Sequence, residues 1–114
     1  MIYHIARLEE FRVLKSRGSY FPTQFPQDGF IHCSTKNQVV PVANNWFKNS
    51  ADLVLLEIDE QKLMAEVKYE NLEGGQDMYP HIYGEIQFSA ITRYAFFVPH
   101  SSSFSFPTEW IEEK

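Results

Sequence analysis

The amino-acid sequence predicts an α+β domain in which two main helices pack on a mixed or mostly antiparallel sheet. Segments with the alternating or continuous apolar pattern of strands outnumber segments with helical spacing, and both helix-like segments fall in the first half of the chain. A length of 114 residues suits one domain, to which we assign residues 1–114. The hydrophobic share of 44% is enough for its core.

The chain is expected to begin with a strand and a helix. Ile2–Ala6 combines bulky β-forming residues with one polar position, His4. Apolar residues then recur at helical spacing among charged ones, and Gly18 offers a C-terminal stop, which predicts a helix from about Arg7 to Arg17. Residues 18–29 contain two prolines and are predicted to form an ordered surface loop, of the kind that often lines a site.

A second strand and a second helix should follow this loop. Residues 29–33 predict the strand, and Ser34 or Thr35 supplies an oxygen that can cap the helix. The apolar stripe of that helix consists of Val39, Val40, Ala43, Trp46 and Phe47. Pro41 predicts a kink or a break after one turn, because proline removes a backbone donor.

Three more strands are predicted in the second half of the chain. Residues 52–59 are almost continuously aliphatic, which indicates a central strand covered on both faces. Residues 65–71 alternate between apolar and charged side chains and predict a strand with one wet face, and residues 91–98 form the last strand. Between these two strands, a turn-rich loop begins at Gly74 and ends with the sequence YPHIYG at residues 79–84.

Composition argues against several classes of function. The net charge is −5, and the chain has no cluster of Lys and Arg, so duplex nucleic acid is not an expected partner. No apolar run approaches the roughly 20 residues of a membrane helix, so no membrane partner is expected. A single cysteine, Cys33, and a charged N-terminal segment predict a cytoplasmic protein without an internal disulfide.

Three of the four histidines, His4, His32 and His81, lie in or beside short apolar segments. An imidazole buried without a partner costs on the order of 1–3 kcal/mol, so each needs a hydrogen-bond partner, a ligand or a metal. Taken singly, each histidine is more often a satisfied core residue. Three together favour a shared functional site.

The sequence DGFIHCST at residues 28–35 places His32 on one face of its strand, together with Phe30 and Ser34. Ile31 and Cys33 lie on the other face. If that face packs on the core, His32 points toward a cleft or toward a covering helix. Cys33 is then a small buried residue, and a catalytic thiolate is not expected because the neighbouring imidazole points away from it.

Other candidate groups surround the third histidine. In YPHIYG a proline precedes His81 and a glycine follows closely, which fits either an ordinary aromatic turn or a positioned functional group. Three imidazoles can also hold zinc with an open fourth position, but no HxH or HExxH spacing supports a metal site. Glu57, Asp59 and Glu70 are the strand carboxylates that can act as acid or base, and Glu70 is the strongest candidate.

The order of these segments resembles the DUF952 family. The residues that carry the resemblance are IYHIA near the start, a loop with Gly-Ser-Tyr, DGFIHCST, LVLLEID, VKYE and YPHIYG, which together cover nearly the whole chain. The resemblance implies a fold similar to the ADP-ribosyltransferase superfamily, shared by NAD-dependent ADP-ribosyl transferases and RNA 2′-phosphotransferases. In that superfamily NAD lies in a cleft, and a residue of the first strand holds ribose or phosphate. An aromatic residue stacks on nicotinamide, and a glutamate often binds a ribose hydroxyl.

The resemblance also implies roles for single residues. His4 corresponds to the first-strand residue and, with His32, is expected to hold ribose or phosphate. The segment from Gly29 to Ser34, which includes Phe30, corresponds to the second motif of the superfamily and is expected to contact the cofactor.

The remaining roles fall to the second half of the site. Tyr83 or Tyr20 is expected to stack on a ring of the ligand. His81 is expected to polarise a hydroxyl or to act as acid or base near neutral pH. The position of the transferase glutamate is occupied by residues 81–84, HIYG, and Glu85 follows.

Three hypotheses follow from the residues and the resemblance. The first is an enzyme that acts on NAD or a related nucleotide through a His-rich cleft, with NAD as the possible cofactor. The second is a non-catalytic domain that binds a nucleotide-like small molecule in the same cleft. The third is a zinc-dependent hydrolase, for which the spacing gives the least support. Ligand-induced stabilisation and release of nicotinamide separate these hypotheses.

Overall fold

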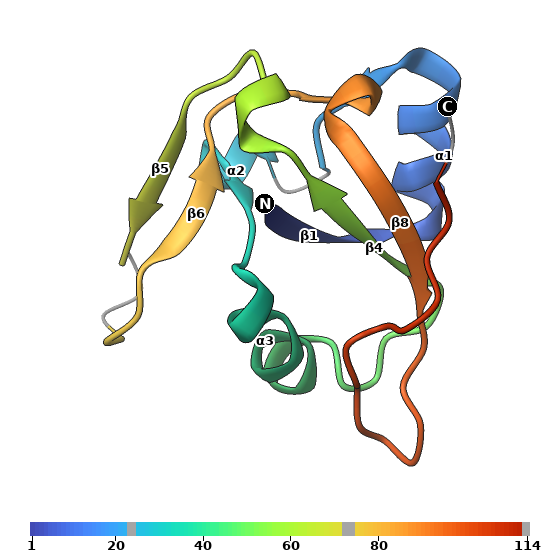
Figure 1. The fold of residues 1–114 in the computed structure, drawn as a ribbon. Helices are drawn as coiled ribbons and strands as arrows, with labels where there is room; N and C mark the ends of the chain where they lie inside the picture. The colour runs from blue at the N-terminus through green and yellow to red at the C-terminus, as the bar shows by residue number, and fades with distance from the viewer. Residues whose placement is uncertain (23–24, 72–74, 113–114) are drawn as a thin grey trace.

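Three antiparallel sheets organise the computed structural model, which describes residues 1–22, 25–71 and 75–112 (Figure 1). The elements follow in the order β1 (Ile2–Arg7), α1 (Leu8–Arg17), β2 (Ser19–Tyr20), α2 (Phe25–Asp28), β3 (Ile31–His32), η1 (Lys36–Gln38), α3 (Val39–Trp46), β4 (Leu53–Ile58), η2 (Glu60–Lys62), β5 (Val67–Glu70), β6 (Tyr79–Ile82), β7 (Ile86–Gln87), η3 (Phe88–Ala90) and β8 (Ile91–Phe97). The sheets have the orders β1-β4-β8, β2-β7 and β3-β6-β5. The predicted α+β class with antiparallel pairing is confirmed.

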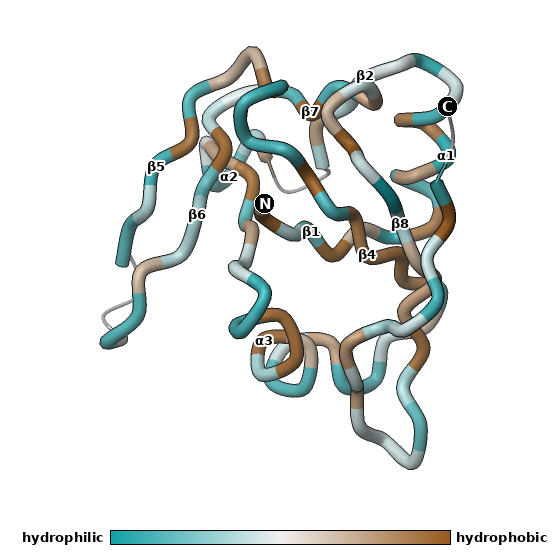
Figure 2. Tube along the Cα trace, in the orientation of Figure 1, coloured by the Kyte–Doolittle hydropathy of each residue, from teal (hydrophilic) through white to brown (hydrophobic). Residues whose placement is uncertain are grey.

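Strand β4 is the middle of the largest sheet. All six of its residues are buried, and it pairs antiparallel with β1 on one side and with β8 on the other. Figure 2 shows hydrophobic residues along β4, whereas β5 mixes hydrophobic and hydrophilic positions. The prediction of a central strand at residues 52–59 is therefore confirmed. A strand is also found within residues 65–71, but not its single wet face: Lys68 and Tyr69 are both exposed although they lie on opposite faces.

Helices α1 and α3 cover opposite faces of the β1-β4-β8 sheet. Phe11 and Leu14 of α1 pack in the cluster that contains Val54 and Leu56. On the other face, α3 residues pack in the cluster that contains Leu53 and Leu55. Residues in β4 alternate between the two clusters because successive side chains of a strand point to opposite faces. Each fully buried aliphatic side chain contributes about 1.5–3 kcal/mol to folding.

The ends of the two helices follow the sequence signals. Helix α1 ends at Gly18, whose φ of 85° is the left-handed conformation that glycine adopts without strain, and the Gly18 N–H donates to the Leu14 carbonyl at 2.7 Å. Before α3, the Thr35 N–H donates to Gln38 Oε1 at 3.0 Å, and the 3₁₀ turn η1 precedes the α-helix. Pro41 lies in the first turn of α3, where a missing N–H costs little, and the α-helix continues past it to Trp46. The change from 3₁₀-helix to α-helix occurs before the proline, between Gln38 and Val39.

Two stretches differ from the predicted loops. The segment at residues 18–29 contains the short elements β2 and α2, and residues 79–82 form β6, the middle strand of its sheet. Pro80 suggested a turn, but it lies within β6, and its carbonyl accepts the Cys33 N–H at 3.0 Å. Proline has no N–H to donate in return, and this costs little here because the partner strand β3 ends at His32. After β6, a Cβ atom on Gly84 would lie 2.6 Å from the Ala65 Cβ, so this turn has room for glycine alone.

Residues 31–34 connect two of the sheets. Strand β3 pairs with β6, with His32 opposite His81. On the other side, Tyr3 and Ser34 exchange both backbone hydrogen bonds at 2.8 Å, which attaches the same segment to β1. Residues before Ser34 turn away from β1 to pair with β6, so the outer edge of β1 is left open after Tyr3. Among the helices in the described ranges, none has the length and apolar character needed to cross a membrane.

A buried carboxylate network ties β1, β4 and β8 together on the α3 side of the sheet. The Glu57 carboxylate accepts hydrogen bonds from Tyr3 Oη at 2.8 Å, from Thr92 Oγ1 at 2.6 Å, and from Arg93 Nε and Nη2 at 3.0 Å each. The Trp110 ring lies 4.3 Å from the Arg93 guanidinium carbon. Burial alone would raise the pKa of the Glu57 carboxyl, but the hydrogen bonds from Arg93, Thr92 and Tyr3 outweigh burial and lower it. Glu57 thus has a structural role.

Replacement of Arg93 by alanine is expected to lower the free energy of unfolding by about 1–3 kcal/mol at neutral pH, because it leaves the buried Glu57 carboxylate short of donors. The folded-state pKa of Glu57 lies below its unfolded value, so this stabilisation is present above about pH 4.3 and is lost as the pH falls through the folded pKa. Denaturant unfolding at pH 7 and pH 3 measures both effects. The control is Arg12→Ala, an exposed arginine of α1. A stability difference that is equal at both pH values would contradict the prediction.

Candidate functional site

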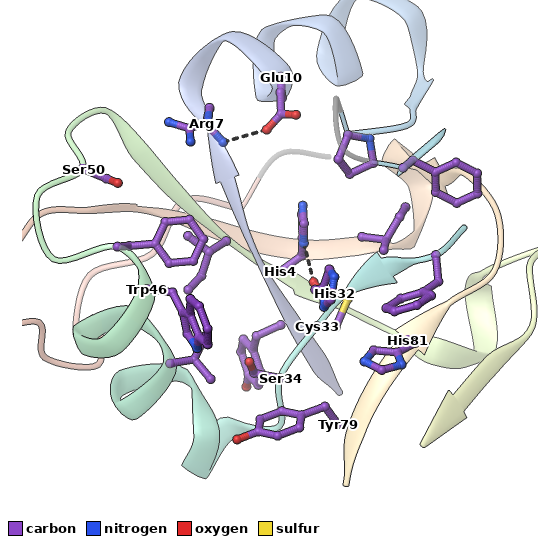
Figure 3. Close-up of a pocket in the computed structure, with 18 residues that line it drawn as sticks. His4, Arg7, Glu10, His32, Cys33, Ser34, Trp46, Ser50, Tyr79 and His81 are labelled. Atoms are coloured by element: carbon purple, nitrogen blue, oxygen red, sulfur yellow. Dashed lines mark hydrogen bonds between the residues drawn. The ribbon is translucent and has the colours of Figure 1, made fainter. Parts of the chain in front are cut away.

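A cavity of about 610 Å³ lies along the open edge of β1 (Figure 3). Its lining comes from β1, the start of α1, α3 and β6, together with Pro22, Phe25 and residues 30–34. This volume is in the range of pockets that bind drug-sized small molecules. Helix α3 forms one side of the cavity, and β3 with β6 forms the opposite side, because residues 31–32 pair with β6 and leave the β1 edge beyond Tyr3 uncovered.

The predicted histidines His4, His32 and His81 all line this cavity, although they come from three different strands. His4 lies on β1, and the paired positions of β3 and β6 carry the other two. The ring centroids of His32 and His81 are 5.4 Å apart. Phe30 stacks on His81 with a centroid distance of 4.1 Å and also contacts His32 at 4.7 Å. The sheet junction therefore gathers the imidazoles around one cavity.

His4 has one satisfied and one unsatisfied ring nitrogen. Its Nδ1 lies 2.8 Å from the His32 carbonyl oxygen, which can only accept, so Nδ1 carries the proton. Its Nε2 is buried and has no hydrogen-bond partner among the described residues. Burial lowers the pKa of His4, and the bond to the His32 carbonyl opposes that effect only in part. The neutral ring therefore presents an unpaired acceptor nitrogen.

His32 and His81 each have a carboxylate behind the ring. His32 Nε2 lies 3.0 Å from Asp28 Oδ2, and His81 Nδ1 lies 3.0 Å from Glu70 Oε1. Glu70 also accepts the Tyr83 hydroxyl at 2.5 Å, and the hydrogen bonds from Tyr83 and His81 lower the pKa of the Glu70 carboxyl. Because a carboxylate only accepts, the bonded nitrogen of each ring carries the proton. His32 Nδ1 and His81 Nε2 are then the acceptor nitrogens of the neutral rings.

The backbone of Ile5 adds a donor and an acceptor at the open edge of β1. Tyr3 directs its N–H and C=O toward Ser34, and in an antiparallel ladder the residue two positions on directs its groups the same way. Ile5 lines the cavity, and no described residue beyond the sheet is bonded to its backbone. The cavity thus contains an accessible peptide edge beside His4.

The structure brings five of the nine residues predicted for the site into the cavity lining. These are His4, Phe30, His32, Ser34 and His81. Tyr20, Gly29, Glu70 and Tyr83 are not lining residues. Glu70 and Tyr83 reach the cavity through His81, and Gly29 supplies a φ of 80° before β3. Tyr20 is buried beside His4, with the ring centroids 6.3 Å apart.

The single thiol of the chain, on Cys33, is buried. Ile31 and Cys33 face the core, as the strand alternation predicts, while the His32 side chain is 48% exposed. Burial also raises the pKa of the Cys33 thiol, so the nucleophilic thiolate is disfavoured.

Within the described ranges, no group of three His, Cys, Asp or Glu side chains is placed to hold a metal ion.

Two contributors were missed in the sequence. Asp28 falls in the loop predicted at residues 18–29, but it ends α2, and its carboxylate lies beside the His32 ring of β3. Trp46 was assigned to the buried stripe of its helix, but it is 71% exposed and lines the cavity. Helical spacing gave no signal for Asp28, because His32 belongs to a strand and Gly29 breaks the helix between them. The sequence also gave no signal for the exposure of Trp46, because helical spacing does not show that α3 ends at this residue.

These features describe a small α+β domain with a histidine-lined cavity at the open edge of its main sheet. Residues 5–94 match the family model described as protein of unknown function (DUF952), and the chain belongs to this family. The comparisons therefore show the family resemblance seen in the sequence, and they leave its link to the ADP-ribosyltransferase superfamily as a prediction.

Solved structures of protein CC0527 from Caulobacter crescentus share this fold. Its X-ray crystal structure is 32% identical in sequence, covers 90% of each chain and superposes with a TM-score of 0.80. Its solution NMR structure is also 32% identical, covers 90% of this chain and 89% of the other, and gives a TM-score of 0.78. No curated protein matches the sequence.

His4 is expected to remain neutral as the Nδ1–H tautomer at pH values where an ordinary imidazole is half protonated, about pH 6.5, because burial lowers its pKa. Long-range ¹⁵N–¹H NMR spectra recorded between pH 5 and pH 8 report the tautomer and the titration midpoint. The unfolded chain binds this proton more readily, so the free energy of unfolding should fall as the pH drops below about 6.5. A His4 midpoint near 6.5 would show that the ring is solvated.

Proposed function

We propose that the cavity binds a nucleotide of the NAD class, and that the protein is an enzyme with the ADP-ribosyltransferase-like fold that acts on it. The observation that carries this proposal is the unpaired, buried Nε2 of His4 in a cavity of nucleotide size. A buried acceptor without a partner costs about 1–3 kcal/mol, which a ligand hydroxyl recovers when it donates to that nitrogen. Ribose hydroxyls are donors of this kind.

The arrangement of ring protons supports a ligand rich in donors. His4, His32 and His81 each direct a ring proton to a protein oxygen, so in the neutral state each retains one acceptor nitrogen. Neighbouring hydroxyls of a sugar match such a set better than phosphate oxygens do, because phosphate oxygens need donors. We therefore assign the ribose hydroxyls to His4 and His32, which leaves the acceptor nitrogen of His81 for an attacking hydroxyl.

The backbone of Ile5 supports a carboxamide group next to that sugar. An N–H and a C=O on the same strand edge pair reciprocally with an amide, which offers one acceptor and two donors. Nicotinamide carries a carboxamide on a planar ring. A nicotinamide riboside unit can thus satisfy both the Ile5 edge and the His4 nitrogen, which lie on adjacent residues of β1.

His81 has the geometry of a general base. Glu70 holds the Nδ1 proton and orients the ring, which leaves Nε2 to accept a proton. In the proposed reaction an acceptor hydroxyl, water in the simplest case, attacks C1′ of the ribose. A C–O bond forms, the bond to nicotinamide breaks with its electron pair on the departing nitrogen, and the hydroxyl proton passes to His81 Nε2. Glu70 acts through His81 as a positioning residue.

One observation favours the second candidate function, a binding domain without catalysis. Among the lining residues in the described part of the chain, Glu10 is the one carboxylate, and it lies in the first turn of α1. Departure of nicotinamide creates positive charge on the sugar, which an adjacent carboxylate would stabilise. Glu70 and Asp28 instead lie behind imidazoles. Ligand binding without nicotinamide release is the result that this reading expects.

NAD and ADP-ribose are expected to raise the Tm of the protein by several degrees at saturating concentration, because they bind the folded state alone. His4→Asn should abolish most of this shift, since asparagine can keep the donor to the His32 carbonyl but lacks the Nε2 acceptor. His81→Asn should keep the shift and lower the rate of nicotinamide release by about 10²–10⁴-fold. Thermal unfolding and chromatographic assay of nicotinamide measure the two effects.

The matched control is His100→Asn, which alters the fourth histidine, an exposed residue outside the cavity lining. It should change neither the ligand-induced shift nor nicotinamide release. Stabilisation of the wild-type protein without any release of nicotinamide would select the binding domain over the enzyme. If neither nucleotide raises the Tm, the proposed function is wrong.

A further inference from the structure

The most exposed aromatic side chain that lines the cavity is Trp46, at the end of α3. Its side chain is 71% exposed, although tryptophan is among the side chains that gain most from burial. Val42 and Phe47, also from the α3 region, line the same side of the cavity. Figure 3 shows the Trp46 ring on the α3 side and His32 and His81 on the β3–β6 side. Trp46 and the two imidazoles therefore line different sides of the same cavity.

The second tryptophan shows what a satisfied indole looks like in this protein. Trp110 stacks on the Arg93 guanidinium at 4.3 Å, and its Nε1–H donates to the Pro107 carbonyl at 3.2 Å. Its ring also contacts Tyr3 and Phe106. No described residue stacks on Trp46 or bonds to its indole nitrogen. Trp110 thus completes the core, while Trp46 keeps an uncovered ring face.

Two independent features indicate that a small ligand covers this face. Trp46 lines the same cavity as His4, whose buried Nε2 lacks a partner, so the cavity is incomplete at a polar position and at an aromatic one. A ligand that carries both a hydroxyl group and a planar ring can fill both positions. Flat stacking on an indole suits a heteroaromatic ring, because every base or nicotinamide ring presents a π face.

We propose that Trp46 is the stacking surface for a planar heteroaromatic ring of the ligand. This inference rests on the proposed function and names a residue that determines its ligand specificity. It moves the stacking role away from Tyr20 and Tyr83, which do not line the cavity. Ligands with a ring on the sugar should therefore bind more tightly than ribose 5-phosphate, which has none.

The first experiment measures affinity by calorimetry with NAD, nicotinamide mononucleotide, AMP and ribose 5-phosphate. Trp46→Ala should weaken binding of the ring-bearing ligand by about 5- to 150-fold, the range for loss of one base–aromatic stack. Trp46→Phe should lose less, since a ring remains. Nicotinamide mononucleotide and AMP separate the two rings of NAD, and the one whose affinity falls identifies the stacked ring. Binding of ribose 5-phosphate should not change.

The second experiment uses the two tryptophans as separate probes. In Trp110→Phe, the fluorescence of Trp46 should be quenched when a ring-bearing nucleotide binds. In Trp46→Phe, the fluorescence of Trp110 should stay constant under the same titration. Phe96→Ala is the matched control, because Phe96 is 57% exposed and does not line the cavity. It should leave both affinity and quenching unchanged.

The outcomes separate this inference from the proposed function. If wild-type protein binds NAD and Trp46→Ala binds it equally well, with no quenching of Trp46, the stacking role is wrong and the proposed function stands. If the wild-type protein binds none of the four ligands, the proposed function fails and this inference fails with it. If Trp46→Ala instead converts a dimer to a monomer in light scattering, the ring is covered by a second copy of the chain, and stacking on a ligand is overturned.

Discussion

The site depends on the double pairing of one short segment, residues 31–34. It pairs with β6 on one side and bonds to β1 through Tyr3 and Ser34 on the other, so it fixes the distance between two sheets. The same segment supplies the His32 carbonyl that holds the His4 ring. Where it separates from β1, an open strand edge remains, and the cavity lies along that edge. The junction of the sheets and the floor of the cavity are therefore built from the same hydrogen bonds.

Buried polar groups in this protein fall into two sets with different states of satisfaction. The Glu57 carboxylate has donors from Tyr3, Thr92 and Arg93, which joins all three strands of the main sheet. The exceptions among the described residues are His4 Nε2 and Tyr20 Oη, whose rings lie 6.3 Å apart. Burial raises the pKa of Tyr20 well above its ordinary value, so its hydroxyl stays neutral. Because a network left incomplete is costly, the gap beside the cavity is where a ligand gains most.

The fold could be predicted wherever one physical signal dominated. The aliphatic run of β4 and the helical spacing of α1 were sufficient because burial decides both. The sequence did not predict β6, because Pro80 suggested a turn. The missing N–H of a proline excludes a strand only where the neighbouring strand continues past it, and β3 ends at His32. For the site, three imidazoles in apolar segments were an informative pattern because an unpaired imidazole is costly to bury. The link from Glu70 to His81 depends on cross-strand register, which one-dimensional spacing does not contain. The prediction that Trp46 is buried failed for the same reason. Helical spacing shows which residues share a face of the helix, but not whether another element packs against that face.

The placement of carboxylates limits what the imidazoles can do. A carboxylate beside the sugar would stabilise positive charge directly, whereas one behind an imidazole fixes the ring and makes its far nitrogen a better acceptor. Asp28 and Glu70 both take the second position, and the His32 carbonyl does the same for His4. Each of the three rings, when neutral, thereby keeps one nitrogen that can accept a hydrogen bond from a hydroxyl group. Under the proposed function, the reaction therefore proceeds through an activated hydroxyl rather than through a stabilised cation, and an acceptor that cannot lose a proton to His81 is a poor substrate.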